Sequence, residues 1–98
     1  MKSNINPEYI LETRKIYGSW IKLLREGKGW SQQELSDKIG ISQSTITKIE
    51  NGRWNFGIDT ITVLAVHLDF FVFFLEKDSE DDLAKTMRAR WNQSHQEN

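Results

Sequence analysis

Two short stretches within residues 30–52 carry apolar residues at helical spacing and are separated by a turn. In the first stretch Leu35 and Ile39 lie four residues apart, so both fall on one face of a helix. In the second stretch Ile46 and Ile49 share a face in the same way. Polar residues occupy most of the positions between them. The pattern therefore predicts two short helices that bury one side each.

Serines and a glycine mark the ends of these two helices. Ser31 and Glu34 form the Ser-x-x-Glu pattern of a capping box, which satisfies free amides at the start of a helix. Gly40 can adopt the left-handed conformation that ends a helix without a Cβ penalty. Ser42 can then cap the second helix. Two helices with this spacing form a helix-turn-helix, whose second helix can enter the major groove of DNA.

The second helix is polar on its outer face and has no acidic residue before Glu50. An exposed helix usually favours Asp or Glu in its first turn, where the helix dipole stabilises them. A helix that approaches phosphates cannot carry acids there, and glutamine, hydroxyl and lysine side chains suit base edges. A solvated face that merely lacks acids is the alternative. The candidate base-reading residues are Gln43, Ser44, Thr47 and Lys48.

The segment SQQELSDKIGISQSTITKIENG resembles the DNA-binding core of the phage-repressor and Cro family, also called XRE-like. The resemblance covers residues 16–75 and implies an all-α fold, a small lambda-repressor-like helical bundle. It implies that Gln43, Ser44 and Lys48 read bases. It also implies that Gln32 contacts a phosphate and bonds Gln43, and that Asn51 begins a loop that touches phosphate.

The same resemblance matches Arg25 and Glu50 to a partly buried ion pair. The sequence gives an independent reason, because Arg25 ends an apolar helix and Glu50 ends the recognition helix. Pairing them would offset the desolvation of each charge, and removing one partner from a dry site costs about 3–5 kcal/mol. The alternative for Arg25 is a cation that faces the DNA groove.

The loop after the second helix departs from the family pattern. Gly57 stands where many members carry proline, and Ile58 stands where some repressors place a basic residue near the minor groove. No minor-groove contact is therefore expected. Trp54 is expected to pack across its own loop, with bracing of the sugar–phosphate backbone as the alternative. The residues expected to contact the sugar–phosphate backbone of DNA are Gln32, Thr45, Asn51, Arg53 and Asn55.

Two further helices flank this unit. Pro7 is tolerated at the first helical position and begins a long helix that ends at Gly27 or Gly29, with Gly18 as a candidate interruption. The residues expected to face the core from this helix are Ile16, Trp20, Leu23 and Leu24. Asp59 is expected to cap a fourth helix. Its expected core residues are Ile61, Leu64, Ala65 and Leu68.

Six consecutive apolar residues follow, too many for so small a domain to cover. They are Phe70, Phe71, Val72, Phe73, Phe74 and Leu75. Their aromatic and β-branched content favours a strand, which would pair with the same strand of a second copy across a two-fold axis. A fifth short helix is the alternative. A terminal helix opens after Ser79 and carries Leu83, Met87 and Trp91 on one narrow face, for packing or for another protein.

Length and charge bound the organisation. The 98 residues divide into a DNA-binding domain, 1–69 with its core at 16–69, and an extension, 70–98, with a disordered tail from about residue 92. Residues 1–56 hold nine Lys or Arg against six Asp or Glu, whereas residues 57–98 hold four against eight. A basic contact face and an acidic far side follow. A net positive charge as small as that of residues 1–56 predicts few phosphate contacts per subunit. Two subunits are therefore expected on the DNA, as a homodimer on double-stranded DNA.

Composition excludes several classes of function. The chain has no cysteine and no apolar run near 18 residues, so a cytoplasmic protein without disulfides or a membrane partner is expected. His67 and His95 lack the neighbours that a metal site or catalysis requires, so we expect no enzyme, metal or cofactor. The predicted function is a dimeric, sequence-specific transcriptional regulator, a repressor at a near-palindromic operator. The alternative is an antitoxin-like module that binds DNA and grips a toxin through its C-terminal segment.

Overall fold

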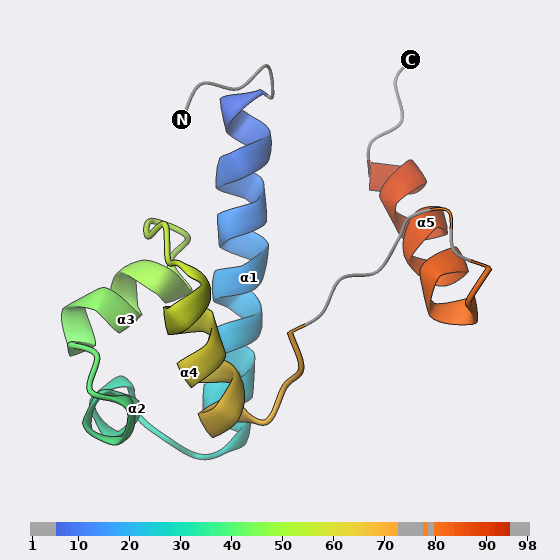
Figure 1. The fold of residues 1–98 in the computed structure, drawn as a ribbon. Helices are drawn as coiled ribbons and strands as arrows, with labels where there is room; N and C mark the ends of the chain where they lie inside the picture. Colours follow the sequence, from blue (N-terminus) through green and yellow to red (C-terminus); the bar gives the residue numbers. More distant parts are fainter. Residues whose placement is uncertain (1–5, 73–77, 79, 95–98) are drawn as a thin grey trace.

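The computed structural model describes residues 6–72, 78 and 80–94, and within these residues all of the regular secondary structure is helical. The helices are α1 (Pro7–Gly27), α2 (Gln32–Ile39), α3 (Gln43–Glu50), α4 (Ile58–Leu68) and α5 (Asp82–Ser94). Figure 1 shows α2, α3 and α4 gathered along one side of the long helix α1, with α5 on its other side. The predicted all-helical fold with a helix-turn-helix is confirmed for this part of the chain.

The ends of α2 and α3 are closed by the residues that the sequence predicted. The Ser31 side chain accepts from the Glu34 amide at 3.0 Å, and Glu34 Oε1 accepts from the Ser31 amide at 3.2 Å, which completes the capping box. Gly40 ends α2 in the left-handed region with φ 72°. Ser42 Oγ then accepts from the Thr45 amide at 3.2 Å and caps α3. These local bonds fix the turn that sets α3 across α2.

A single small core joins the first four helices. α1 packs against α3 and α4, and α2 packs against the same two helices. The core residues are Ile21, Leu35, Ile46, Ile49, Leu64 and Leu68, which are all buried. Every one of the four helices contributes to this cluster, so α3 is held on its inner side by apolar contacts with α1 and α2.

The prediction for the core face of α1 was wrong for three of its four residues, because Leu24 packs against the core while Ile16, Trp20 and Leu23 are about half exposed. The buried residues of this helix are Gly18, Ile21 and Arg25, whereas Trp20 is 58% exposed. Gly18 does not interrupt α1, which runs unbroken past it. A Cβ at position 18 would lie 2.9 Å from the carbonyl oxygen of Glu50 and closer still to that of Ile49, so glycine is required for the close approach of α3. The exposed stripe of α1 is therefore Ile16, Trp20 and Leu23, at about half of their surface each.

The predicted cap of α4 was also wrong. The N-cap position is Gly57, which has no side chain to bond the first amides of the helix. Asp59 lies one residue inside α4, in the first turn. A carboxylate in the first turn is stabilised by the positive end of the helix dipole, without bonding as a cap.

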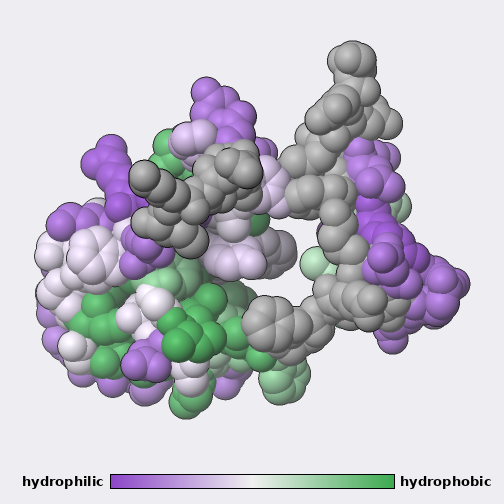
Figure 2. Space-filling model, turned by 45° about the horizontal axis from the view of Figure 1, so that its top comes forward, coloured by the Kyte–Doolittle hydropathy of each residue, from purple (hydrophilic) through white to green (hydrophobic). Residues whose placement is uncertain are grey.

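The segment after α4 carries the apolar run. Phe70, Phe71 and Val72 belong to neither a helix nor a strand, and Phe70 packs partly on the core. Phe73, Phe74 and Leu75, with the rest of the predicted strand, lie outside the described residues, as does Ser79. Near the start of α5, the Leu83 amide donates to Asp81 Oδ1 at 2.9 Å. In Figure 2 hydrophobic residues gather on the visible face of the bundle, while the visible face of α5 is mainly hydrophilic.

Candidate nucleic-acid interface

Helix α3 presents the candidate base-reading residues on its outer side. Gln43, Ser44 and Lys48 are exposed, and Thr47 is half-buried. Gln43 and Thr47 are four residues apart, as are Ser44 and Lys48, so the four side chains form one continuous face. The first turn of α3 contains no acidic residue. The structure thus brings these four residues together opposite the apolar face that enters the core.

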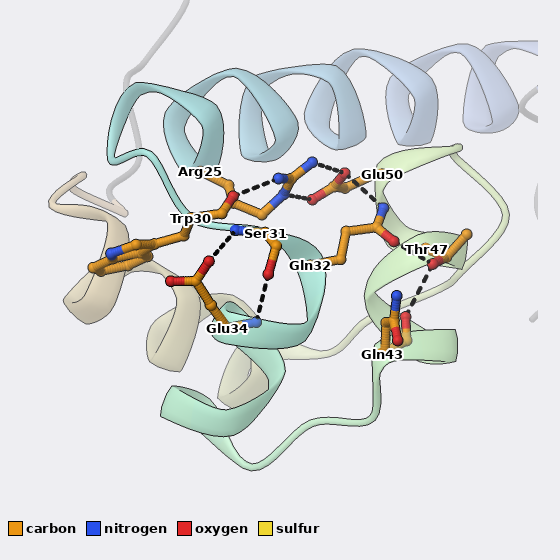
Figure 3. Close-up of polar contacts among 8 residues, drawn as sticks. All are labelled: Arg25, Trp30, Ser31, Gln32, Glu34, Gln43, Thr47 and Glu50. Atoms are coloured by element: carbon orange, nitrogen blue, oxygen red, sulfur yellow. Dashed lines mark hydrogen bonds and ion pairs between the residues drawn. The ribbon is translucent and has the colours of Figure 1, made fainter.

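A buried ion pair lies behind the end of α3. Arg25 Nε donates to Glu50 Oε2 at 2.7 Å, and Arg25 Nη2 donates to Glu50 Oε1 at 3.0 Å (Figure 3). Arg25 Nη1 also donates to the Trp30 carbonyl oxygen at 2.6 Å. The hydrogen bond with Glu50 raises the pKa of Arg25 above its usual value, against burial, which lowers it. The two-pronged pair ties α1 to the last residue of α3.

Gln32 extends this pair to the outer face of α3. Gln32 Nε2 donates to Glu50 Oε1 at 3.1 Å, and Gln32 Oε1 accepts from the Thr47 hydroxyl at 2.8 Å. Thr47 Oγ1 also lies 3.0 Å from the Gln43 carbonyl oxygen (Figure 3). Thr47 thus stands between Gln32 and Gln43, the two glutamines that the resemblance paired directly. Sequence reasoning missed this polar network, because Thr47 is not adjacent to Gln32 in the chain.

The N-terminal turn of α3 holds a cluster of hydroxyl groups. The Ser42 hydroxyl donates to Thr45 Oγ1 at 2.9 Å and lies 3.2 Å from Ser44 Oγ. Thr45 is half-buried, and Ser44 is exposed. This turn is the positive end of the α3 dipole, an environment that favours anions such as phosphate.

The loop after α3 places polar groups beside the same helix. Asn51 occupies the C-cap position of α3, and Asn51, Arg53 and Asn55 are all exposed. The Lys48 ammonium lies 5.4 Å from the centre of the Trp54 ring, within the range of a cation–π contact. Trp54 thus contacts α3 through Lys48, and its packing across its own loop stays a prediction. Sequence reasoning missed this contact, and the six-residue spacing across a tight turn was the available signal.

Neither metal chemistry nor a membrane span emerges from the residues that the structure describes. They contain no group of three or more His, Cys, Asp or Glu side chains placed to hold a metal ion. No helix among them combines the length and the hydropathy that crossing a membrane requires. The arrangement offers instead a row of neutral and basic polar groups on a rigid helix, with hydroxyls at its positive end.

Comparison with known proteins gives the class to which this arrangement belongs. Residues 21–70 match the helix-turn-helix family model. The chain belongs to this family, in its XRE branch, a family of DNA-binding proteins and not of enzymes. The protein is a helix-turn-helix DNA-binding regulator.

Individual relatives agree with this class. The chain is 32% identical to the antitoxin HipB of Escherichia coli O6:H1, strain CFT073, over 84% of this chain and 94% of the relative. It is 32% identical to a hypothetical transcription factor of Neisseria meningitidis serogroup B, over 58% of this chain and 54% of that protein. It is 36% identical to an uncharacterised helix-turn-helix regulator of Sinorhizobium fredii, over 56% of this chain and 71% of that protein. No solved structure gives a significant match.

Proposed function

We propose that the protein is a dimeric, sequence-specific transcriptional repressor that reads a near-palindromic operator in the major groove. The observation that carries this proposal is the acid-free outer face of α3, where Gln43, Ser44 and Lys48 are exposed. Such side chains match the donors and acceptors of base edges. The inner side of the same helix is anchored by buried apolar residues and the ion pair, so the reading face is presented rigidly.

The residues divide into two roles in this proposal. The base edges are read by Gln43, Ser44, Thr47 and Lys48. The phosphates are contacted by Gln32 at the start of α2, by Thr45 in the first turn of α3, and by Asn51, Arg53 and Asn55 at the end of α3 and in the loop that follows. Phosphate contacts position the helix, and base contacts supply the sequence preference.

A second copy of the chain completes the proposal. Two recognition helices related by a two-fold axis would enter successive major grooves about 34 Å apart. Phe71 is 92% exposed, and together with Tyr17 and Trp20 of α1 it lines a groove of about 450 Å³. The groove is lined by Tyr17, Trp20, Ile21, Leu24, Ile61, Phe70, Phe71, Val72 and Met87. Pairing of residues 70–75 with those of the second copy would cover this apolar surface.

Selection from a pool of random double-stranded oligonucleotides tests the function. The expected product is an enriched sequence with two inverted half-sites whose centres are about 10 base pairs apart. That single experiment reports sequence preference, symmetry and spacing together. A pool that shows no enrichment after repeated rounds would contradict sequence-specific recognition, and a single asymmetric half-site would contradict the dimer.

A second candidate function is an antitoxin-like module that also binds a partner protein. The observation that favours it is the length of the alignment with HipB, 88 residues, which extends well beyond the helix-turn-helix match at residues 21–70. The C-terminal extension would then hold the partner, through the exposed Leu83 and Met87 of α5.

Purification of the full chain from its native host separates the two candidates. A second polypeptide that co-elutes in fixed ratio, and that is lost from the Met87→Asp variant while operator binding persists, supports the antitoxin-like function. A homodimer that elutes alone from the same host supports the simple repressor.

A further inference from the structure

The hydroxyl group of Thr47 is hydrogen-bonded within the protein. Its oxygen lies 2.8 Å from Gln32 Oε1 and 3.0 Å from the carbonyl oxygen of Gln43. Both neighbours are acceptors, and a hydroxyl has a single hydrogen to donate. Whichever of the two receives that hydrogen, none remains for a group outside the protein.

The direction of this hydrogen bond follows from the buried ion pair. The Glu50 carboxylate is bonded twice by Arg25 and only accepts hydrogen bonds, so it must face the NH₂ group of the Gln32 amide. The amide oxygen of Gln32 then faces Thr47, and the Thr47 hydroxyl must be the donor. The direction of the hydrogen bond between Thr47 and Gln32 is therefore set by the buried charges of Glu50 and Arg25.

Thr47 still lies on the reading face of α3. It follows Gln43 by four residues and Ser44 by three, which places it beside both on the helix surface. It is half-buried, so part of the side chain is open to a ligand. With the hydrogen of the hydroxyl engaged, the γ-methyl group is the part that suits an apolar contact with a base.

We propose that Thr47 recognises a thymine through a contact between its γ-methyl group and the C5-methyl group of the base. Among the base pairs only A·T displays a methyl group in the major groove, whereas G·C displays only polar groups, the N7 and O6 acceptors of guanine and the N4 donor of cytosine. Thr47 therefore selects A·T at one position of each half-site. This inference rests on the proposed recognition of DNA by α3.

Replacement of single thymines by deoxyuridine tests this contact, because the exchange removes only the methyl group. Affinities are measured for the full-length wild type and for Thr47→Val, Thr47→Ser and Thr47→Ala, on the operator obtained by selection. Valine keeps the methyl group and serine keeps the hydroxyl. The readout is the ratio of affinities for the thymine and deoxyuridine operators within each variant, which a general loss of affinity does not change.

At one thymine per half-site the ratio is expected to be about fourfold for the wild type and Thr47→Val, the factor for withdrawing one methyl group from water. It is expected to fall to about one for Thr47→Ser and Thr47→Ala, because both variants lack the γ-methyl group. Should valine unfold the domain, the wild type and Thr47→Ser decide the question by themselves.

Three results overturn the proposal in distinguishable ways. A ratio that survives in Thr47→Ser and disappears in Thr47→Val would make the hydroxyl the reading group. A wild-type ratio near one at every thymine would leave Thr47 without a methyl contact, although the operator is recognised. A random pool without any enriched sequence would remove the proposed function itself, and this contact with it.

Discussion

Glu50 accepts hydrogen bonds from two residues, Arg25 and Gln32, at a position where only 6% of its surface is exposed. A buried charge is tolerated only when it is paired and its remaining hydrogen-bonding capacity is used. The described residues leave no buried side-chain polar atom without a partner, so this requirement is met. The stability of the network therefore depends on all of its members.

Removal of one charge from the pair is expected to destabilise the domain strongly. Arg25→Ala leaves the Glu50 carboxylate buried without its cation, and we expect a loss of about 3–5 kcal/mol in the free energy of unfolding. Urea unfolding followed by circular dichroism measures it. The exposed Lys22→Ala on the same helix serves as the control, with an expected change within about 0.5 kcal/mol. Equal unfolding curves for the two variants would show that the ion pair adds nothing.

Removal of a proposed base-reading side chain is expected to weaken DNA binding and to leave the stability of the domain unchanged. Gln43→Ala and Lys48→Ala truncate exposed side chains, so the unfolding curve should stay within about 0.5 kcal/mol of the wild type. Specific binding should weaken by about 1–3 kcal/mol for each variant in gel-shift titrations with the selected operator. The exposed Gln33→Ala on α2 is the matched control and should bind as the wild type does. Wild-type affinity in both α3 variants would disprove their base-reading role.

At the scale of elements, the position of α3 depends on how closely α1 approaches it. The contact surface of α1 is formed by Gly18, Ile21 and Arg25, at positions i, i+3 and i+7. A glycine in the middle of a 21-residue helix lowers helix propensity, and here the absent side chain makes room for the carbonyl groups at the end of α3. The same residue that weakens α1 as a helix therefore allows it to pack.

Gly18→Ala is expected to destabilise the domain although alanine is the better helix former. The added Cβ would lie 2.9 Å from the Glu50 carbonyl oxygen, so α3 must shift, at an expected cost of about 1–3 kcal/mol. Gly27→Ala is the matched control, because its Cβ would meet no atom within 4 Å and the change should be neutral or slightly stabilising. Thermal unfolding compares the two. A higher melting temperature for Gly18→Ala would contradict the close contact.

The local features of the helices could be predicted from the sequence, and the long-range ones could not. The capping box at Ser31, the left-handed Gly40 and the cap at Ser42 depend on residues within four positions of each other, and all three are confirmed. The core face of α1 was misassigned because its larger apolar residues, such as Trp20, also recur at helical spacing. Periodicity identifies a helix but does not say which of two stripes a partner will cover.

In the candidate site too, local features could be predicted from the sequence and long-range contacts could not. Its outer residues were named from their types and spacing along α3, and their roles remain predictions. The link from Glu50 through Gln32 to Thr47 joins residues 15 to 18 positions apart, and only the folded structure brings them together.

Asp59 was expected as a cap because its side chain is suited to that role, yet α4 begins at Ile58 and takes Gly57 as its N-cap.

At the scale of the whole molecule, charge and hydropathy are distributed unevenly. The positive surplus lies in residues 1–56 and the negative one in residues 57–98, although the net charge is only −1. Such asymmetry would favour contact of the N-terminal part of the chain with DNA over contact of residues 57–98. The exposed apolar residues of α1 and of the segment after α4 do not belong to α3, so a second copy that covered them would leave the proposed reading face open.

Phe71→Asp is expected to produce monomers. Phe71 is 92% exposed in the single chain, so a charge there should leave the domain folded, yet it would be buried in the proposed dimer contact. Sedimentation velocity gives the oligomeric state. The matched control is Val66→Asp, an exposed apolar residue of α4 outside the segment, which should remain a dimer. If Phe71→Asp sediments as a dimer, residues 70–75 are not the interface.

The exposed outer residues of α3 are different from the residues that hold the helix in place. This separation has a consequence for the design of variants that bind other DNA sequences. Gln43, Ser44 and Lys48 hold no part of the core, whereas Thr47 is bonded to the Gln32 network. Exchange of the first three side chains should therefore redirect the protein to a different promoter without a penalty in folding. Position 47, by contrast, would keep its preference across such reprogrammed variants, so that orthogonal pairs of protein and operator would share one invariant base pair per half-site.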